Sequence, residues 1–220
     1  FNQEITAINE ELDQTIKESN ELNQRFIHMI DLVSDLGDNT PENNKGFLSE
    51  LLNTVTEIVP EADYGLISVI KESGECNFVG AIGHNCSLLK TIDINKNILI
   101  TSKQNRVTIL QDYPFNFNKL SDVQKRKMKK ALKPISKTIF ININLNSDII
   151  GSLSLDIARD SNKVFSNITK RILKSFASLA SAFFSFQRYN ELQSKFTKEM
   201  VTSVTNILEI YDKYTGGHSE

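Results

Sequence analysis

A histidine and a cysteine lie two positions apart, at His84 and Cys86, with Asn85 between them. Imidazole and thiolate are both good ligands for transition metals, so this tripeptide could contribute to a metal, haem or redox-sensing site. Two such residues are too few for a closed site, and the remaining histidines are His28 and His218. The sequence therefore favours a site without a metal here.

One cation and three aromatic residues form a second candidate group: Arg106, Tyr113, Phe115 and Phe117. Aromatic rings with a cation suit a nucleotide base or a small anionic metabolite. The alternative is that at least two of the rings pack in a core or a loop. The sequence has no evident glycine-rich phosphate loop, nucleophile elbow or paired-carboxylate motif. Histidine and cysteine are also too sparse for the usual catalytic sets, so we expect no enzyme within residues 45–188.

A dense run of basic residues follows these aromatics. Apolar residues such as Met128 and Leu132 are interleaved with it, which is typical of the solvated face of an amphipathic helix. Binding to RNA or acidic lipid has less support, because no aromatic residues are interleaved for stacking. The run consists of Lys125, Arg126, Lys127, Lys129, Lys130 and Lys133.

The composition is that of an ordinary soluble domain with extended helices. The chain has 220 residues, 40% hydrophobic and 24% charged, and a formal net charge of −2, so we expect neither nucleic acid nor an anionic membrane as the main partner. Two cysteines favour a reducing compartment, and we expect a cytoplasmic location. No stretch approaches the roughly 18 apolar residues that span a bilayer. The chain begins at Phe1 rather than a methionine, so we expect a segment of a longer protein, and an upstream membrane anchor stays open.

Residues 1–36 have the pattern of one long helix with a coiled-coil seam. Apolar residues recur there with three-four spacing, and charged residues occupy the outer positions. The 3.5-residue period favours a helix that self-associates, and hence a homodimer; the alternative is an amphipathic helix lying on its own domain. The seam positions are Ile5, Ile8, Leu12, Thr15, Ser19, Leu22, Phe26, Met29, Val33 and Leu36.

The next segment predicts a helix followed by a hairpin. Apolar residues at helical spacing predict a helix over residues 47–59 that ends at Pro60. Residues 64–70 and 76–82 predict two antiparallel strands joined by a turn.

The middle of the chain gives weaker signals. Residues 87–110 are ambiguous, and we expect a short helix near 95–104 and a brief strand at 106–110. Residues 112–118 predict a loop. Over residues 119–133 the apolar side chains share one helical face, which we expect to include Val123.

The last part predicts a second hairpin and a second long helix. Residues 138–145 and 149–157 alternate between apolar and polar, and such a hairpin with one apolar face needs helices packed on that side. Gly151 lies within it and would let a helix approach the sheet. A helix then begins after Phe165 and extends to about residue 211, with an apolar stripe that thins at Asn190 and Gln193.

The order of these elements resembles the GAF domain, the small-molecule sensor module of signalling proteins. Three stretches carry the resemblance: residues 62–69 with 78–83, the run Ile150-Gly151-Ser152-Leu153-Ser154-Leu155, and the helix that follows Phe165. Asn142-Ile143 departs from the Pro-Leu that is usual in the penultimate strand. The resemblance implies an α+β fold over residues 45–188, with a central antiparallel sheet and helices packed on it.

The same resemblance implies a ligand pocket. The spacing of His84 and Cys86 differs from that of the cysteine–histidine pair in bilin-binding GAF domains. Asn95-Lys96 is similar to part of the motif of cyclic-nucleotide-binding GAF domains, but the other residues of that motif are not evident. The sequence therefore does not identify the ligand. Residues 189–211 would form a connecting helix. The pocket candidates are His84, Asn85, Cys86, Arg106, Tyr113, Phe115 and Phe117.

Residues 212–220 resemble the start of a different domain. The segment is similar to the entry motif of HD-GYP phosphodiesterases, which hydrolyse cyclic-di-GMP at a metal centre. The similarity lies in Asp212, Tyr214, Thr215, Gly216, Gly217 and His218. On this resemblance His218 is a ligand of a divalent metal in a downstream domain, whereas residues 1–220 need no cofactor and hydrolyse nothing. Tyr214 stands where some relatives have a glutamate ligand, so a third metal is not expected. The alternative is a helix that ends at glycine with an incidental histidine.

Two hypotheses follow for function. In the first, the chain is a dimeric GAF sensor whose flanking helices regulate a downstream HD-GYP-type phosphodiesterase in response to a small molecule. In the second, it binds no small molecule and is a dimerisation spacer that feeds another output, such as a kinase.

Overall fold

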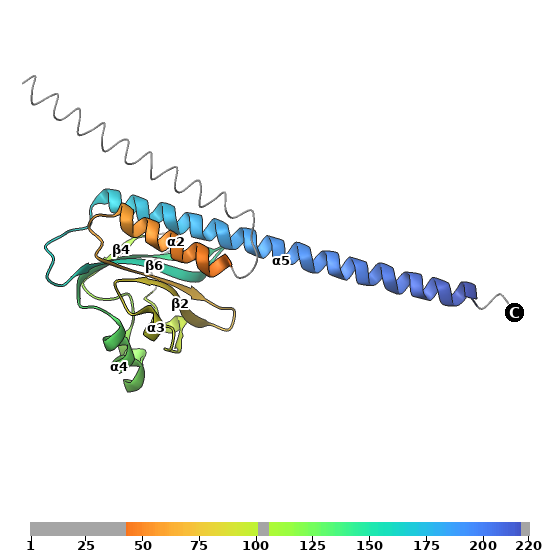
Figure 1. The fold of residues 1–220 in the computed structure, drawn as a ribbon, viewed down its shortest axis with the longest axis horizontal. Coiled ribbons are helices and arrows are strands. Elements are labelled where there is room, and N and C mark those ends of the chain that lie inside the picture. Colours follow the sequence, from red (N-terminus) through yellow and green to blue (C-terminus); the bar gives the residue numbers. More distant parts are fainter. Residues whose placement is uncertain (1–42, 101–105, 217–220) are drawn as a thin grey trace, which may run out of the picture. The chain divides into compact units, whose positions relative to one another are not determined.

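The fold is built on a six-stranded antiparallel sheet with the strand order β3-β2-β1-β6-β5-β4. The computed structural model describes residues 43–100 and 106–216 (Figure 1), so two predictions lie outside it, the coiled coil of residues 1–36 and the role of His218 as a metal ligand. The strands are β1 (Tyr64–Ile70), β2 (Glu75–Ile82), β3 (Ile94–Asn95), β4 (Thr108–Leu110), β5 (Ile135–Leu145) and β6 (Asp148–Ala158). The helices are α2 (Asn43–Ile58), α3 (Cys86–Leu89), α4 (Asp122–Ala131) and α5 (Asn167–Gly216), with 3-10 turns η2 (Lys96–Ile98) and η3 (Phe117–Lys119).

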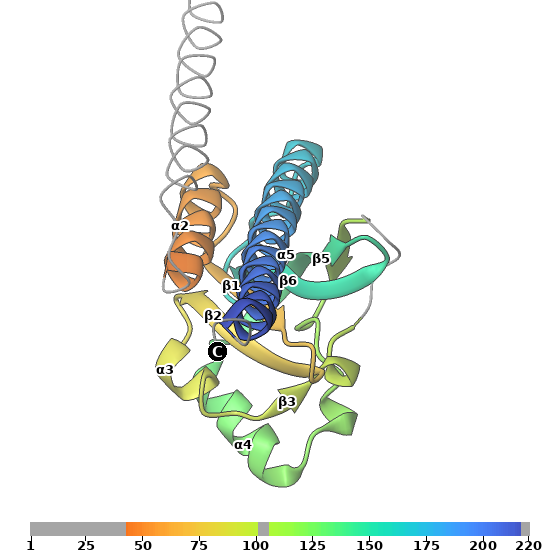
Figure 2. The same cartoon turned by 90° about the vertical axis from the view of Figure 1, so that its right-hand side faces the viewer.

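Helix α2 and the first part of α5 lie side by side on one face of the sheet (Figures 1 and 2). Their buried side chains include Leu51 and Leu52 on α2 and Leu173 and Phe176 on α5. Removing this apolar surface from water stabilises the layer by about 25 cal/mol per Å². The predicted helix over residues 47–59 and the two predicted hairpins are confirmed.

Close packing of α2 depends on two glycines that the sequence did not single out. A Cβ at Gly65 would lie 3.0 Å from Leu52 Cδ1, and one at Gly80 would lie 3.3 Å from Leu52 Cδ2. Gly151 has a different neighbour, because its Cβ would lie 2.4 Å from the carbonyl oxygen of Ser68 on β1. The expectation that Gly151 admits a helix is therefore wrong: it admits the neighbouring strand.

The second face of the sheet is covered by a lobe formed by residues 84–100 and 106–133, which contains α3, β3 and α4 (Figure 2). The hairpin of β5 and β6 is therefore buried on both faces, and Thr138, Asn142 and Asp156 are at most 2% exposed. The predicted alternation of apolar and polar residues is confirmed, but the polar face is buried as well. The polar side chains face the interior because the lobe covers them.

Within the lobe, one prediction is wrong and two are confirmed in part. The helix expected near residues 95–104 is replaced in the described part by β3, η2 and an extended Leu99. Asn95 caps the short turn η2, because its side chain accepts a hydrogen bond from Asn97 N–H, and the extended backbone of Leu99 ends that turn. The strand expected at 106–110 is limited to β4. Helix α4 is present, but Val123 is 56% exposed instead of buried.

Residues from Ser181 onwards form a separate unit, which is the C-terminal part of α5. Large apolar side chains are exposed along it at helical spacing: Phe186, Tyr189, Leu192, Phe196, Met200, Val201, Val204 and Ile207. In the N-terminal part of α5, Ile168 is also exposed, although the sequence placed it in the buried stripe. No helix of the described part is long and apolar enough to cross a membrane.

Candidate functional site

A buried histidine–aspartate pair joins the lobe to the sheet. His84 follows β2 and Asp156 lies near the end of β6, and the side chains of both are fully buried. His84 Nε2 lies 3.0 Å from Asp156 Oδ2, and the Lys133 N–H donates to His84 Nδ1 at 3.0 Å. Because Nδ1 accepts this bond, the proton of the neutral ring is on Nε2 and is donated to Asp156.

Two tyrosines surround this pair. The rings of Tyr64 and Tyr113 have their centroids 5.0 and 5.9 Å from that of His84. The Tyr113 hydroxyl donates to the Lys133 carbonyl, so both backbone groups of Lys133 are held, one by His84 and one by Tyr113. Burial, with the charges of Asp156 and Asp112 nearby, raises the pKa of Tyr113 well above its usual range. Tyr113 is therefore a hydrogen-bond donor at neutral pH.

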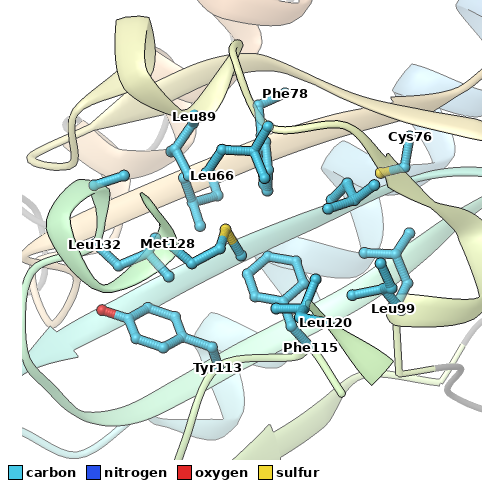
Figure 3. Close-up of a cluster of buried hydrophobic side chains, with 14 of the residues drawn as sticks. Leu66, Cys76, Phe78, Leu89, Leu99, Tyr113, Phe115, Leu120, Met128 and Leu132 are labelled. Carbon is cyan, nitrogen blue, oxygen red and sulfur yellow. The ribbon is translucent and has the colours of Figure 1, made fainter. Parts of the chain in front are cut away.

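The predicted aromatic residues do come together. Tyr113 stacks on Phe115 with ring centroids 6.3 Å apart, and Phe117 contacts both rings. The rings of Phe78 on β2 and Phe115 are packed in a T-shaped arrangement with their centroids 5.7 Å apart. These rings form part of a buried apolar cluster between the sheet and the lobe, shown in Figure 3 with Leu66, Met128 and other members.

Three of the predicted residues lie elsewhere. Asn85 is exposed and caps α3, because its side chain accepts from Leu88 N–H at 3.0 Å. Cys86 is the first residue of α3 and is partly exposed, with a free thiol. Arg106 is exposed before β4. The structure thus groups His84 with the aromatic residues and leaves Asn85, Cys86 and Arg106 outside that group.

A row of polar side chains crosses the sheet beneath the apolar cluster. Ser68, Ser152 and Asn142 are directly opposite one another on β1, β6 and β5, and all are at most 6% exposed. No nitrogen or oxygen of the described residues is within hydrogen-bond distance of Ser68 Oγ. Burial raises the pKa of the neighbouring Cys76 thiol to about 11, although the Ser68 hydroxyl acts in the opposite direction.

A second unsatisfied group is Asp156 Oδ1, which is buried and has no hydrogen-bond partner in the described part of the chain. Buried polar atoms usually find a partner, so this oxygen is an acceptor that a bound molecule or water could use. Sequence reasoning missed Asp156 and the serine row. Alternating Ser152, Ser154 and Asp156 resemble a solvent-facing side of a strand, and only the covering lobe makes them interior.

Potential metal ligands do not cluster at the site in the described part of the chain. Among residues 43–100 and 106–216, no group of three or more His, Cys, Asp or Glu residues is placed to hold a metal ion. Both nitrogens of His84 already have protein partners. The basic side chains of α4 also lie outside the site, since Arg126, Lys129 and Lys130 are exposed.

Comparison with solved structures identifies the architecture. No protein-family model and no curated protein matches the chain. The GAF domain of a phosphoenolpyruvate-protein phosphotransferase from Coxiella burnetii superposes with a TM-score of 0.55 at 14% identity, over 76% of this chain and 96% of that one. This is the GAF fold.

Two further similar structures come from other kinds of protein. One is from a Pseudomonas syringae pv. tomato protein described as a sensor histidine kinase, with a TM-score of 0.53 and 14% identity over 82% of this chain and 98% of that one. The other is a GAF domain/HD domain protein from Geobacter sulfurreducens, with a TM-score of 0.50 and 15% identity over 67% and 95%. At these identities the likeness shows the GAF fold alone.

Proposed function

We propose that this chain is the sensory module of a signalling protein and that it recognises a small molecule between the sheet and the lobe. One observation carries the proposal: within the described part of the chain, the covered face of the GAF sheet contains a fully buried carboxylate oxygen without a hydrogen-bond partner, Asp156 Oδ1. Leaving such a group unpaired costs roughly 1–3 kcal/mol. A ligand with hydrogen-bond donors would recover that cost.

The chemistry of the interior favours a ligand that donates hydrogen bonds over a phosphate-bearing one. No lysine or arginine is buried in the described part of the chain, and Arg106, which could have met an anion, is exposed. Asp156 supplies a carboxylate, and the cluster around Phe78, Phe115 and Met128 supplies apolar surface. A small amine, amide or amino-substituted heterocycle fits this combination of groups.

Native mass spectrometry on freshly purified protein tests ligand binding. We expect a retained molecule in the wild type that disappears on denaturation and is lost in Asp156→Asn. The amide oxygen can still accept from His84, whereas the amide nitrogen replaces the free acceptor with a donor. Asp148→Asn, an exposed change at the start of β6, is the matched control and should retain the molecule. An empty wild type prepared from several growth conditions would contradict sensing.

A ligand-free dimerisation spacer is the second candidate, and a specific observation favours it. The space between the sheet and the lobe is occupied by side chains of the protein itself, with Met128 and Leu89 at 0% exposure and Phe78 at 3% (Figure 3). A core packed to this density needs no ligand. In that case wild type and Asp156→Asn would both give the mass of the unliganded chain in native mass spectrometry.

For the output, we propose a downstream HD-GYP-type phosphodiesterase that acts on cyclic-di-GMP, with His218 as one of its metal ligands. The motif of residues 212–220 supports it, and the GAF domain/HD domain protein of Geobacter sulfurreducens provides a structural parallel. A kinase output is the alternative, supported by the Pseudomonas syringae neighbour. Protein extended beyond Glu220 should hydrolyse cyclic-di-GMP, and His218→Ala should abolish this. Autophosphorylation without hydrolysis would favour the kinase.

A further inference from the structure

Two groups of hydrogen bonds, joined by the backbone of residues 61–63, lead from the lobe to the start of α5, and the first group contains the buried pair. Lys133 N–H donates to His84 Nδ1, and His84 Nε2 is 3.0 Å from Asp156 Oδ2. Lys133 lies between α4 and β5, where the lobe returns to the sheet. A movement of the lobe at this point therefore pulls directly on the Asp156 side chain.

The backbone of Asp156 continues the first group on its other side. Its carbonyl accepts from Asp63 N–H at 2.9 Å, and Asp63 Oδ2 accepts from Ala158 N–H at 2.9 Å. Asp63 Oδ1 also accepts from Lys163 Nζ at 2.6 Å. The segment before β1 is thus tied both to the end of β6 and to the connection that leads into α5.

The second group is at the first turn of α5. Glu61 Oε1 accepts from Ser166 N–H at 3.3 Å and from the Thr169 hydroxyl at 3.0 Å. Ser166 Oγ in turn accepts from Thr169 N–H at 3.1 Å, which caps the helix. Thr169 is 1% exposed, so water does not readily replace these bonds.

We propose that Asp156 couples the lobe to the first turn of α5 through these two groups of hydrogen bonds, with His84 as the positioning residue on one side and Glu61 as the positioning residue on the other. The proposal rests on the proposed sensory function, for which it supplies the regulation: a molecule that binds Asp156 or displaces the lobe changes the capping of α5. Asp156 is suited to this role because one carboxylate oxygen binds the lobe while its backbone binds the segment before β1.

The coupling is expected to be cooperative because its members are buried and share partners. Breaking the His84 bond leaves a second buried oxygen of Asp156 without a donor, which the interior does not tolerate without rearrangement. The rearrangement has to pass through Asp63 and Glu61, since these residues hold the same backbone segment. Coupling of this kind is reciprocal between its two ends.

Hydrogen exchange measured by mass spectrometry tests the coupling without any ligand. In His84→Phe, which keeps a ring but makes neither bond, we expect amide exchange to become at least about fivefold faster at Lys133 and across residues 166–171. Residues 139–143 in the centre of β5 should be unchanged. Gln124→Ala is the matched control: it removes the capping box of α4 and so loosens the lobe without touching His84. It should leave the exchange of residues 166–171 unchanged.

The reverse experiment starts from the helix. Thr169→Val removes the hydroxyl bond to Glu61, and we expect faster exchange at Lys133. If Gln124→Ala accelerates α5 as much as His84→Phe does, or if Thr169→Val changes only its own helix, the coupling is overturned. Should His84→Phe fail to fold, the Thr169→Val result decides. Because no ligand is used, a negative result here leaves the native mass spectrometry on Asp156→Asn as an independent test of sensing.

Discussion

At the residue scale, the chemistry of this domain depends on which polar groups the lobe encloses. His84 was a candidate from the sequence because it lies beside Cys86, and imidazole and thiolate are good metal ligands. Asp156, its partner, was not, because an aspartate in an alternating strand has the same appearance whether water or a lobe covers it. The two residues are 72 positions apart in the chain, which excludes any local signal. The pair is a property of the tertiary structure.

The two cysteines should differ in reactivity. Burial raises the pKa of Cys76 to about 11, so its thiol stays protonated and enclosed, whereas Cys86 is partly exposed at the start of α3. Only the thiolate reacts with alkylating agents. At pH 8 in native buffer we expect one alkylation per chain, at Cys86, and two after denaturation, as read by peptide mass spectrometry. Cys86→Ser should show almost none in native buffer; rapid labelling of Cys76 would contradict its burial.

Asp63 should contribute stability that is lost in acid. Burial alone would raise its pKa, but hydrogen bonds from Lys163 and from the Ala158 N–H outweigh this, and the pKa lies below its ordinary value. The stabilisation is therefore present above about pH 4, the ordinary pKa of an aspartate, and disappears as the pH falls below that. Asp63→Asn should cost about 1 kcal/mol at pH 7.

Urea denaturation at pH 7 and at pH 3 measures this effect, and the difference between wild type and Asp63→Asn should shrink at the lower pH. Asp148→Asn, at an exposed position at the start of β6, provides the control for a general change in charge. A difference that grows on acidification would contradict the sign of the Asp63 shift.

At the element scale, the spacing of apolar residues predicted the longer helices and the two hairpins. The stripe of α2, both hairpins and the start of α5 follow from three-four or alternating patterns, and each is present. The lobe was predicted poorly because its elements are too short for a period to appear: α3 has four residues and β3 has two. Its conformation is set by side-chain caps at Asn85, Asn95 and Asn116 and by contacts with the sheet.

Gly151 provides a sharp test of how the strands meet. A methyl group there would lie 2.4 Å from the carbonyl oxygen of Ser68, and a backbone atom in a sheet cannot move aside as a side chain can. Gly151→Ala should therefore destabilise the domain by about 1–3 kcal/mol or more. Gly46→Ala is the control with the opposite sign, since Gly46 is exposed within α2 and alanine favours a helix by about 1 kcal/mol.

Thermal and urea unfolding measure both variants. The expected order of stability is Gly46→Ala above wild type above Gly151→Ala. If Gly151→Ala were neutral, the close approach of β6 to β1 would not be as described.

At the scale of the whole molecule, the C-terminal part of α5 carries an exposed apolar stripe that favours pairing with a second copy of the chain. The exposed apolar side chains from Phe186 to Ile207 recur at three, four and seven residues, which is the repeat of a two-stranded coiled coil. Large apolar side chains on an isolated helix gain nothing from exposure to water, whereas pairing with the same stripe of a partner would bury them. The thinning at Asn190 and Gln193 lies within this stripe, where polar residues would weaken the pairing locally and allow two packings.

We therefore expect residues 1–220 to be a dimer at micromolar concentration by size-exclusion chromatography with light scattering. Replacing Phe196 and Met200 by serine should raise the dissociation constant at least about a hundredfold, because each buried apolar side chain contributes about 1.5–3 kcal/mol. Lys195→Ser with Glu199→Ser has the same spacing on the same helix, removes an exposed ion pair and leaves the net charge unchanged, so this control should stay dimeric. A monomeric wild type would contradict dimerisation, and a Phe196→Ser/Met200→Ser variant that dimerises as tightly as the control would place the contact elsewhere than this stripe.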